Sequence, residues 1–315
     1  MDTIFLVLKS LSKLIPMFAY LNVSVFVLDK IRLHKTSEYE GSIITEDITD
    51  KKSLMKIDYE KIKQIIPLIE KLKNNVSEEN LKTLYNNLNS LKVKRKLLLV
   101  MGAVGGFYDI VKNEIIYNVE FLLGHEILHM ASSYYEKENE IELCGFRQRK
   151  EIALIGNGLN EGYTELLASR IYYKNGKPVT YKKEAKIARM LEFFFDDPKE
   201  MENLYFNHNL PGLIHKLESF ASRDEVIKLI NDIDSLTFLS KVPFNPTPTY
   251  NNIKIQLTLY NWFREKCTDF DKLKQLEDLV CENKMAFLAI NKQKNKLHKE
   301  NSYDKKIDSE KRKRK

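Results

Sequence analysis

Cysteine is scarce in this sequence. The three cysteines, Cys144, Cys267 and Cys281, form no CxxC pair, and an odd number cannot all pair within one chain. This excludes a small scaffold held by disulfides and favours a reducing compartment, so we expect a cytoplasmic protein. With 315 residues, of which 43% are hydrophobic, the chain can bury a sizeable core without such bonds.

An N-terminal apolar run long enough to cross a bilayer is also missing. Residues 14–28, LIPMFAYLNVSVFVL, carry no charge, but Lys13 and Asp29 bracket them and Pro16 lies within them. The stretch is shorter than the roughly 20 residues that a spanning helix needs. Basic residues precede the run as in a signal peptide, yet no small-x-small cleavage site follows. We expect a buried element here, and membrane association through residues 14–28 stays open.

Most of the chain, residues 1–290, has no net charge. The sequence carries 51 Lys and Arg against 44 Asp and Glu, but 11 of the basic residues and 4 of the acids follow residue 290. Residues 1–290 therefore balance at 40 of each sign. The excess lies in a tail, 291–315, with few apolar residues, which predicts disorder. We favour a role in solubility for this tail over a contact with nucleic acid or an anionic membrane.

The spacing of apolar residues predicts the elements before residue 120. Residues 53–92 repeat apolar side chains every three or four positions, which indicates two amphipathic helices, the second starting near Ser77. In residues 1–36 the pattern does not distinguish a strand from a buried helix. Residues 97–119 contain three glycines followed by FYDIV and EIIYNV, which predict a hairpin or two edge strands.

Helical patterns dominate the rest of the chain. One runs from about Val119 to Tyr135 with Asn118 as its candidate N-cap, and after an acidic loop and CGFRQRKEIALIGNG a second runs from about Leu159 to Tyr173. Further helices are expected in 181–195, 212–221 and 223–233. A Pro-rich joint at 242–252 then precedes a last helical stretch, 253–290.

Two of only six histidines stand together in HEILH, residues 125–129. On an α-helix, residues four apart differ by about 40° in rotation and one turn in height, so the imidazoles of His125 and His129 can reach one ion. Two imidazole nitrogens, one carboxylate and one water suit tetrahedral Zn²⁺. Glu126 lies out of line with the pair and is free to accept a proton from a metal-bound water. An amphipathic helix with two histidines by chance is the alternative.

A second group of carboxylates follows in NEGYTE, residues 160–165. Glu161 and Glu165 are one helical turn apart on one face, where two carboxylates repel each other unless a cation offsets the charge. We expect Glu161 to be the third metal ligand. Glu165 is then placed to accept a hydrogen bond from the outer N–H of a ligand histidine. Two surface glutamates on an ordinary amphipathic helix remain the alternative.

HEILH and NEGYTE together resemble the signature of the gluzincin metallopeptidases, which include the thermolysin-like and aminopeptidase branches. The resemblance covers about residues 100–175 and implies zinc ligands His125, His129 and Glu161, general base Glu126, and Glu165 beside a ligand histidine. It is a distant one, because 31 residues separate His129 from Glu161 and no GxMEN-like exopeptidase motif precedes them. In such folds an edge strand ahead of the metal helix holds the substrate backbone, a role we assign to EIIYNV.

Other metal sites fit the spacing less well. A metzincin would need glycine and histidine where Ser132 and Tyr135 stand, and a di-iron bundle needs two ExxH motifs where this chain has one. Hydrolysis also calls for a donor to the developing oxyanion. The candidates, each with a structural role as the favoured interpretation, are Tyr181, Tyr205, His208 and His215.

The sequence therefore predicts an α+β fold in which a zincin-like core, a small sheet packed on the HEILH helix, precedes a mainly helical C-terminal part. The expected division is 1–92, an N-terminal region of uncertain role; 93–245, the metallopeptidase core; 246–290, a helical segment; and 291–315, the basic tail. The expected function is zinc-dependent hydrolysis of a peptide or protein substrate. The alternative is a non-catalytic protein that binds a partner, nucleic acid or an anionic membrane; it has no use for Glu126.

Overall fold

The computed structural model describes residues 23–38, 63–95, 105–240 and 245–292. The chain divides into two compact units, Met1–Asn252 and Ile253–Lys315, and the described residues of the first contain both helices and sheets. The prediction of a mixed α+β fold is thus confirmed, while the division into four parts stays a prediction. The apolar residues 14–22, the start of the first predicted helix and the tail from residue 293 lie outside the described residues.

The first sheet has three short strands, β1 (Lys92–Arg95), β2 (Gly106–Asp109) and β3 (Glu114–Tyr117), in the order β1-β3-β2. The predicted hairpin is β2 and β3, which pair antiparallel with Tyr108 opposite Ile115. The assignment of EIIYNV as an edge strand is wrong, because β1 pairs in parallel with the other side of β3. The edge strand of the hairpin is therefore β2, which has β3 as its one strand partner among the described residues.

The HEILH segment forms a shorter helix than its pattern predicts. A 3-10 turn, η2 (Glu120–Leu122), leads into α5 (Leu123–Ala131), and the N-caps are Val119 and Leu122 rather than Asn118. The helix ends at its C-cap Ser132, whose backbone N–H and hydroxyl both donate to Leu128 O, at 3.1 and 2.9 Å. All nine residues of α5 are buried.

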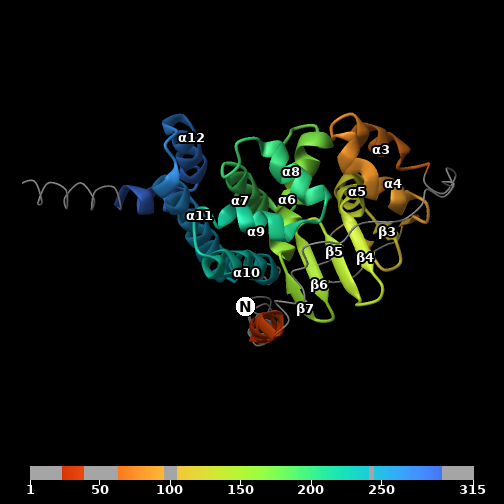
Figure 1. Cartoon of the computed structure of the whole chain (residues 1–315), viewed down its shortest axis with the longest axis horizontal. Coiled ribbons are helices and arrows are strands. Elements are labelled where there is room, and N and C mark those ends of the chain that lie inside the picture. The colour runs from red at the N-terminus through yellow and green to blue at the C-terminus, as the bar shows by residue number, and fades with distance from the viewer. Residues whose placement is uncertain (1–22, 39–62, 96–104, 241–244, 293–315) are drawn as a thin grey trace, which may run out of the picture. The chain divides into compact units, whose positions relative to one another are not determined.

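A second sheet follows directly and was not predicted. It is an antiparallel meander of β4 (Ser133–Glu136), β5 (Ile141–Cys144), β6 (Arg147–Lys150) and β7 (Ala153–Ile155), whose strands lie side by side in chain order (Figure 1). Its third strand, RQRK, has no apolar alternation, since the side chain it buries completely is Gln148. Periodicity therefore could not distinguish this segment from a polar connection.

Helix α6 (Asn157–Ile171) lies at the centre of the first unit and carries the NEGYTE motif. It packs against α5, against α7 (Lys182–Glu192) and against α10 (Arg223–Ser240), so 12 of its 15 residues are buried. Gly162, next to the predicted third ligand, permits the close approach to α7: a Cβ there would lie 2.4 Å from Glu184 O. Larger side chains at this position would push α6 away from its neighbour.

Short helices complete the first unit. On one side α3 (Ile66–Lys73), η1 (Glu78–Leu81) and α4 (Lys82–Leu88) cover α5, and the amide of Asn87 donates to Met130 O and Ser133 O at 2.8 Å each. On another side lie α8 (Pro198–Phe206), which the sequence analysis missed, and α9 (Leu210–Leu217), close to the predicted 212–221. Helices are also found, as predicted, in 181–195 and 223–233.

The remaining described elements are a helix at 23–38 and the helices that follow residue 245. Helix α11 (Thr247–Lys266) runs across the boundary between the units, and α12 (Phe270–Cys281) and residues 284–292 follow it. The stretch predicted as one helix is interrupted at Asp269, whose side chain accepts from the amides of Asp271 and Lys272 and so starts α12. None of the helices in the described ranges combines the length and apolar character that crossing a bilayer requires.

Candidate metal centre

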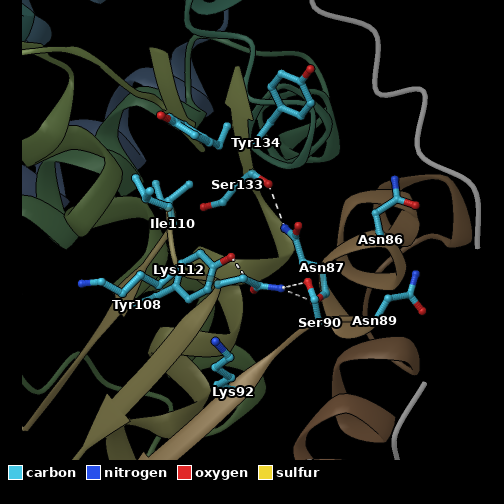
Figure 2. Close-up of a pocket in the computed structure, with 13 residues that line it drawn as sticks. Asn86, Asn87, Asn89, Ser90, Lys92, Tyr108, Ile110, Lys112, Ser133 and Tyr134 are labelled. Carbon is cyan, nitrogen blue, oxygen red and sulfur yellow. Dashed lines mark hydrogen bonds between the residues drawn. The ribbon is translucent and has the colours of Figure 1, made fainter. Parts of the chain in front are cut away.

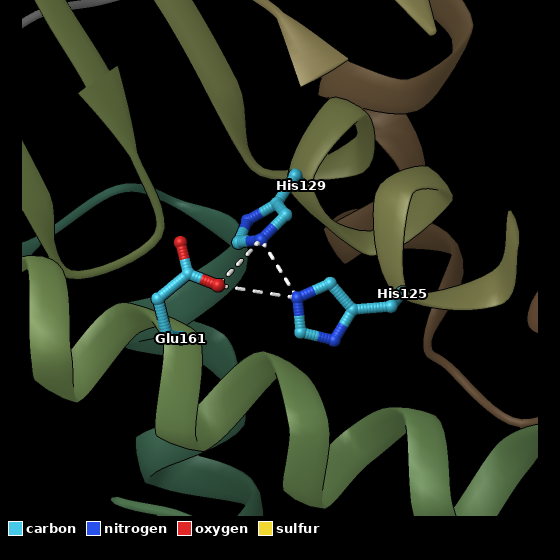
Figure 3. A group of neighbouring side chains, drawn as sticks. All are labelled: His125, His129 and Glu161. Atoms are coloured by element: carbon cyan, nitrogen blue, oxygen red, sulfur yellow. Dashed lines mark hydrogen bonds and ion pairs between the residues drawn. The ribbon is translucent and has the colours of Figure 1, made fainter. Parts of the chain in front are cut away.

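Helices α5 and α6 bring two histidines and one glutamate to a common point. His125 Nε2 lies 3.0 Å from His129 Nε2 and 3.2 Å from Glu161 Oε2, and His129 Nε2 lies 3.4 Å from that oxygen. Figure 3 shows the two imidazoles projecting from α5 toward the carboxylate on α6. The three side chains thus come together although 31 residues separate His129 from Glu161 in the chain.

The spacing of these atoms and their chemistry fit a small tetrahedral cation. Ligands held at about 2.0–2.1 Å from a tetrahedral Zn²⁺ stand roughly 3.3 Å from one another. The three measured separations, 3.0, 3.2 and 3.4 Å, scatter around that value. Two neutral imidazoles and one carboxylate are also the donor set that leaves a fourth position open in hydrolytic zinc sites. The group could therefore hold zinc with little rearrangement.

Glu165 contacts His125 at Nδ1, the ring nitrogen that faces away from His129 and Glu161. Its Oε2 lies 3.0 Å from His125 Nδ1, and the carboxylate also accepts from Thr180 N at 3.0 Å, from Thr180 Oγ1 at 2.7 Å and from the hydroxyl of Tyr173 at 3.2 Å. Burial alone would raise the pKa of Glu165, but the bonds from His125 and Thr180 outweigh it and lower the pKa to about 2. An ionised, fully bonded carboxylate keeps the proton of His125 on Nδ1 and leaves Nε2 for a metal.

The charges inside the cluster attract one another strongly. Burial would lower the pKa of His125, but its hydrogen bonds with Glu161 and Glu165 raise it to about 9. The pKa of His129 is also raised, because attraction to Glu161 exceeds the cost of burial. In turn, burial would raise the pKa of Glu161, yet the two histidines hold it well below its usual range. Glu161 is thus ionised, and its negative charge makes the site favour a positive charge, which either protonated histidines or a bound cation can supply.

Glu126 lies beside strand β2. Its side chain lies beside Gly106, where an added Cβ would stand 3.4 Å from the Glu126 carboxylate, and it accepts a hydrogen bond from the backbone N–H of Tyr108. The residue is 5% exposed, and this burial raises its pKa against the lowering effect of His125 and His129. A raised pKa suits a carboxylate that takes up and returns a proton near neutral pH.

His129 has a partner that the sequence analysis did not predict. Its Nδ1 lies 3.4 Å from Cys144 Sγ, 3.3 Å from the side-chain nitrogen of Asn160 and 3.5 Å from Thr164 Oγ1. If Nε2 binds a metal, Nδ1 carries the proton and needs an acceptor, which an amide NH₂ cannot be. Cys144 on β5 is the nearer of the two groups that can accept. Nothing in the spacing of Cys144 from HEILH signals this contact, because it depends on the unpredicted sheet.

The site is thus a group of three side chains that could hold a metal ion, an adjacent buried carboxylate and a set of outer hydrogen-bond partners. No known protein family, curated protein or solved structure matches this chain. The geometry itself indicates the chemistry that is possible here. The three donors can hold a Lewis-acidic cation, and Glu126 can exchange a proton beside it.

Of the four candidate oxyanion donors, Tyr181 lies at the cluster. Its ring stacks on the imidazole of His125 with centroids 5.7 Å apart and 23° between the planes, and its hydroxyl is hydrogen-bonded to Glu161. The charge of Glu161, followed by burial, raises the pKa of Tyr181 well above its usual value. The hydroxyl therefore keeps its proton and remains a donor.

The other three candidates have structural surroundings. Tyr205 is fully buried and shares a 2.7 Å hydrogen bond with Thr164, and His208 stacks on Tyr134 with ring centroids 5.8 Å apart. His215 is on the surface, where its side chain is 87% exposed beside Glu218. A structural role stays the favoured interpretation for these three, and Tyr205 contacts the outer side of the centre through Thr164.

A pocket of about 530 Å³ lies apart from these ligands, between α4, the turn of the β2–β3 hairpin and β4 (Figure 2). Many of its polar groups are already engaged: Asn87 donates to Met130 O and Ser133 O, and Asn113 donates to Asn87 O and Ser90 Oγ. We interpret these bonds as supports for the hairpin and for the C-terminal end of α5, and none of the three metal-binding side chains lines the pocket.

Proposed function

We propose that the protein is a zinc-dependent metallopeptidase of the gluzincin type, with a zincin-like core, and that it hydrolyses bonds in a peptide or protein substrate. The observation that carries the proposal is the convergence of His125 Nε2, His129 Nε2 and Glu161 Oε2 with Glu126 buried next to them. The three-stranded sheet supports it as well, because β2 and β3 pack on α5, the helix that carries both histidines.

Each residue of the site has its own role in this proposal. His125, His129 and Glu161 hold the ion, and Glu165 and Cys144 orient the two rings from outside. Zinc held by these residues would supply Lewis acidity toward a water and a substrate carbonyl. Glu126 accepts a proton from the attacking water on its carboxylate and then delivers it to the nitrogen of the departing amine, so the carboxylate is regenerated.

Strand β2 is the element that would hold the substrate. It is the outer strand of its sheet and has one strand partner among the described residues, so an extended peptide can pair with its other side. The same strand contacts the base, since the N–H of Tyr108 donates to Glu126. A peptide paired with β2 would therefore pass Glu126, and Tyr181, whose ring stacks on His125, can donate to the oxyanion.

The setting proposed for this chemistry is the reducing interior of the cell. The basis is the sequence argument from three cysteines without CxxC spacing. Cys144 adds a reason, because its thiol must remain reduced to act as an acceptor for His129.

The first test is the metal. We expect the full chain to contain about one zinc by elemental analysis, and His129→Ala and Glu161→Ala to lose it. His215→Ala is the matched control, since that histidine is exposed and outside the cluster. Absence of zinc in the wild type, both as purified and after addition of the metal, would refute the proposal and leave the non-catalytic interaction protein as the better account.

The second test separates catalysis from metal binding. We expect Glu126→Gln to retain its zinc and to lose cleavage of a quenched-fluorescent peptide library by about 100-fold or more. Glu120→Gln, an exposed acid one turn before α5 that pairs with Arg95, should cleave like the wild type. Undiminished cleavage by Glu126→Gln would remove the assigned base and with it the proposed mechanism.

A further inference from the structure

Helix 23–38 has its polar side turned inward. Asp29, Arg32 and Thr36 are 4%, 8% and 2% exposed. The guanidinium of Arg32 donates to Asp29 at 3.1 and 3.2 Å, and to three groups outside the helix: Leu154 O at 3.1 Å, Asp234 at 3.4 Å and Ser235 at 3.2 Å. The hydroxyl of Thr36 also donates to Leu154 O, at 2.9 Å. The helix is therefore fastened to β7 and α10 by hydrogen bonds and ion pairs.

Its apolar side faces outward. Five large hydrophobic side chains of this helix are between 45% and 62% exposed, namely Val23, Phe26, Val27, Leu28 and Ile31. A single exposed apolar side chain is ordinary, but five within nine residues form a continuous patch, and such patches mark interaction sites. The arrangement is the reverse of that in a surface helix of a soluble protein, whose apolar face turns to the core.

We propose that this apolar face docks on an anionic lipid bilayer, where the helix lies in the interfacial plane. The chain itself indicates this occupant. Among residues 3–22, which lead into the helix, the charged residues are Lys9 and Lys13, and the rest of that segment is rich in aliphatic and aromatic side chains. The patch is thus continuous in sequence with a second apolar segment that carries only positive charge.

Basic residues on the helix suit the same occupant. Lys30 is exposed on the same side as the apolar residues, and its ammonium lies 5.5 Å from the centroid of the Phe26 ring. A lysine beside apolar side chains can extend its ammonium to lipid phosphates while its methylene groups stay with those side chains. Apolar side chains together with lysines, here Lys9, Lys13 and Lys30, form the composition by which interfacial helices bind anionic membranes.

Hydrogen bonds through one carboxylate connect the proposed docking helix to α6, the helix that bears Glu161. Asp234, the partner of Arg32, also accepts from the amides of Gly156 and Gly158, at 2.8 and 2.6 Å, where α6 begins. One carboxylate thus connects helix 23–38 to the N-terminus of α6. The inference does not depend on zinc or on peptide hydrolysis, because it rests on the exposure of helix 23–38 and on the sequence before it.

Vesicle flotation of the full chain tests the proposal. We expect the wild type to float with phosphatidylcholine vesicles that contain phosphatidylglycerol, and less with phosphatidylcholine alone. The triple variant Phe26→Ser, Val27→Ser, Ile31→Ser should bind at least about tenfold more weakly, since one deeply buried side chain of this size already contributes that factor. Val111→Ser with Phe270→Ser removes exposed apolar side chains elsewhere and should float like the wild type.

A tryptophan probe locates the contact itself. In a Trp262→Phe background, Val27→Trp should shift its emission to the blue and be quenched by brominated lipids, whereas Val111→Trp should do neither. Equal flotation of the triple variant, or no quenching at position 27, would overturn the proposal. So would a wild type that stays off vesicles but forms a dimer which the triple variant lacks, since the face would then serve a second copy of the chain.

Discussion

The thiol of Cys144 lies 3.4 Å from Nδ1 of His129, so strand β5 contacts the outer nitrogen of a ring whose inner nitrogen belongs to the candidate centre. The side-chain nitrogen of Asn160 also approaches both groups, at 3.3 Å from Nδ1 and 3.7 Å from the sulfur. An amide NH₂ and a protonated Nδ1 are both donors, and the sulfur is the acceptor between them. Cys144 thus contacts Nδ1 of His129 as an acceptor, just as Glu165 contacts Nδ1 of His125.

We therefore expect Cys144→Ala to weaken zinc binding by about 10-fold to 100-fold, the usual effect of losing an outer partner of a ligand histidine. Cys144→Ser keeps an acceptor and should retain most of the affinity. Competition with a chromophoric chelator measures both values. Thermal unfolding of the metal-free variants serves as the control, because a loss of stability without a loss of affinity would assign Cys144 to packing alone.

Removal of the Tyr181 hydroxyl should slow catalysis without releasing the metal. Tyr181→Phe keeps the ring that stacks on His125 and loses the donor hydrogen-bonded to Glu161. We expect kcat to fall by about 100-fold, with zinc content unchanged, as when one oxyanion donor is removed. Steady-state kinetics on a cleaved peptide provide the measurement, and Tyr85→Phe, a surface tyrosine, is the control. An unchanged kcat would exclude Tyr181 as the donor.

Acid should remove a stabilising contribution from Glu165. Its pKa is about 2 in the folded chain against an ordinary value of 4.5, so the contribution is complete above 4.5 and disappears as the pH falls through 4.5 toward 2. Glu165→Gln lacks this contribution. Urea unfolding of the metal-free proteins should show a less stable variant at neutral pH, and the difference from the wild type should shrink in acid. A difference independent of pH would contradict the assigned role.

Loss of Arg32 should destabilise the first unit. Arg32→Ala leaves Asp29 and Asp234 buried without their guanidinium partner, and breaking a buried ion pair from one side costs about 3 kcal/mol. Asp234→Asn in the same chain removes one of the buried charges and should restore part of the loss. Lys228→Ala, which breaks an exposed pair with Asp232, should change the free energy of unfolding by less than about 1 kcal/mol. Urea denaturation distinguishes these cases.

Local geometry explains why the main elements could be predicted. His125 and His129 share a face of α5 because they are four residues apart, and Glu161 and Glu165 share a face of α6 for the same reason. The β2–β3 hairpin follows from two short apolar runs separated by a turn at Asn113, whose φ is 49°. Each of these features depends on residues close together in the chain.

Features that depend on distant partners could not be predicted. The edge position of β2 rather than β3 depends on β1, a short basic strand whose sequence, KVKR, carries little β signal. The meander of β4 to β7 buries Gln148 on a strand that reads as polar, so no alternation reveals it. Helix 23–38 buries Asp29 and Arg32 only because Asp234, Ser235 and the carbonyl of Leu154 meet them.

The order of residues is enough to predict the types and local spacing of the chemical groups: two histidines one turn apart with a glutamate beside the first, and two more carboxylates one turn apart. These relations follow from the 3.6-residue period of the α-helix and need no other part of the chain. Three relations depend on the packing of distant segments: the three donor atoms lie 3.0 to 3.4 Å apart, Cys144 lies against the outer nitrogen of His129, and helix 23–38 turns its apolar side outward. Those relations join segments far apart in the chain, whose packing against one another sequence periodicity does not encode.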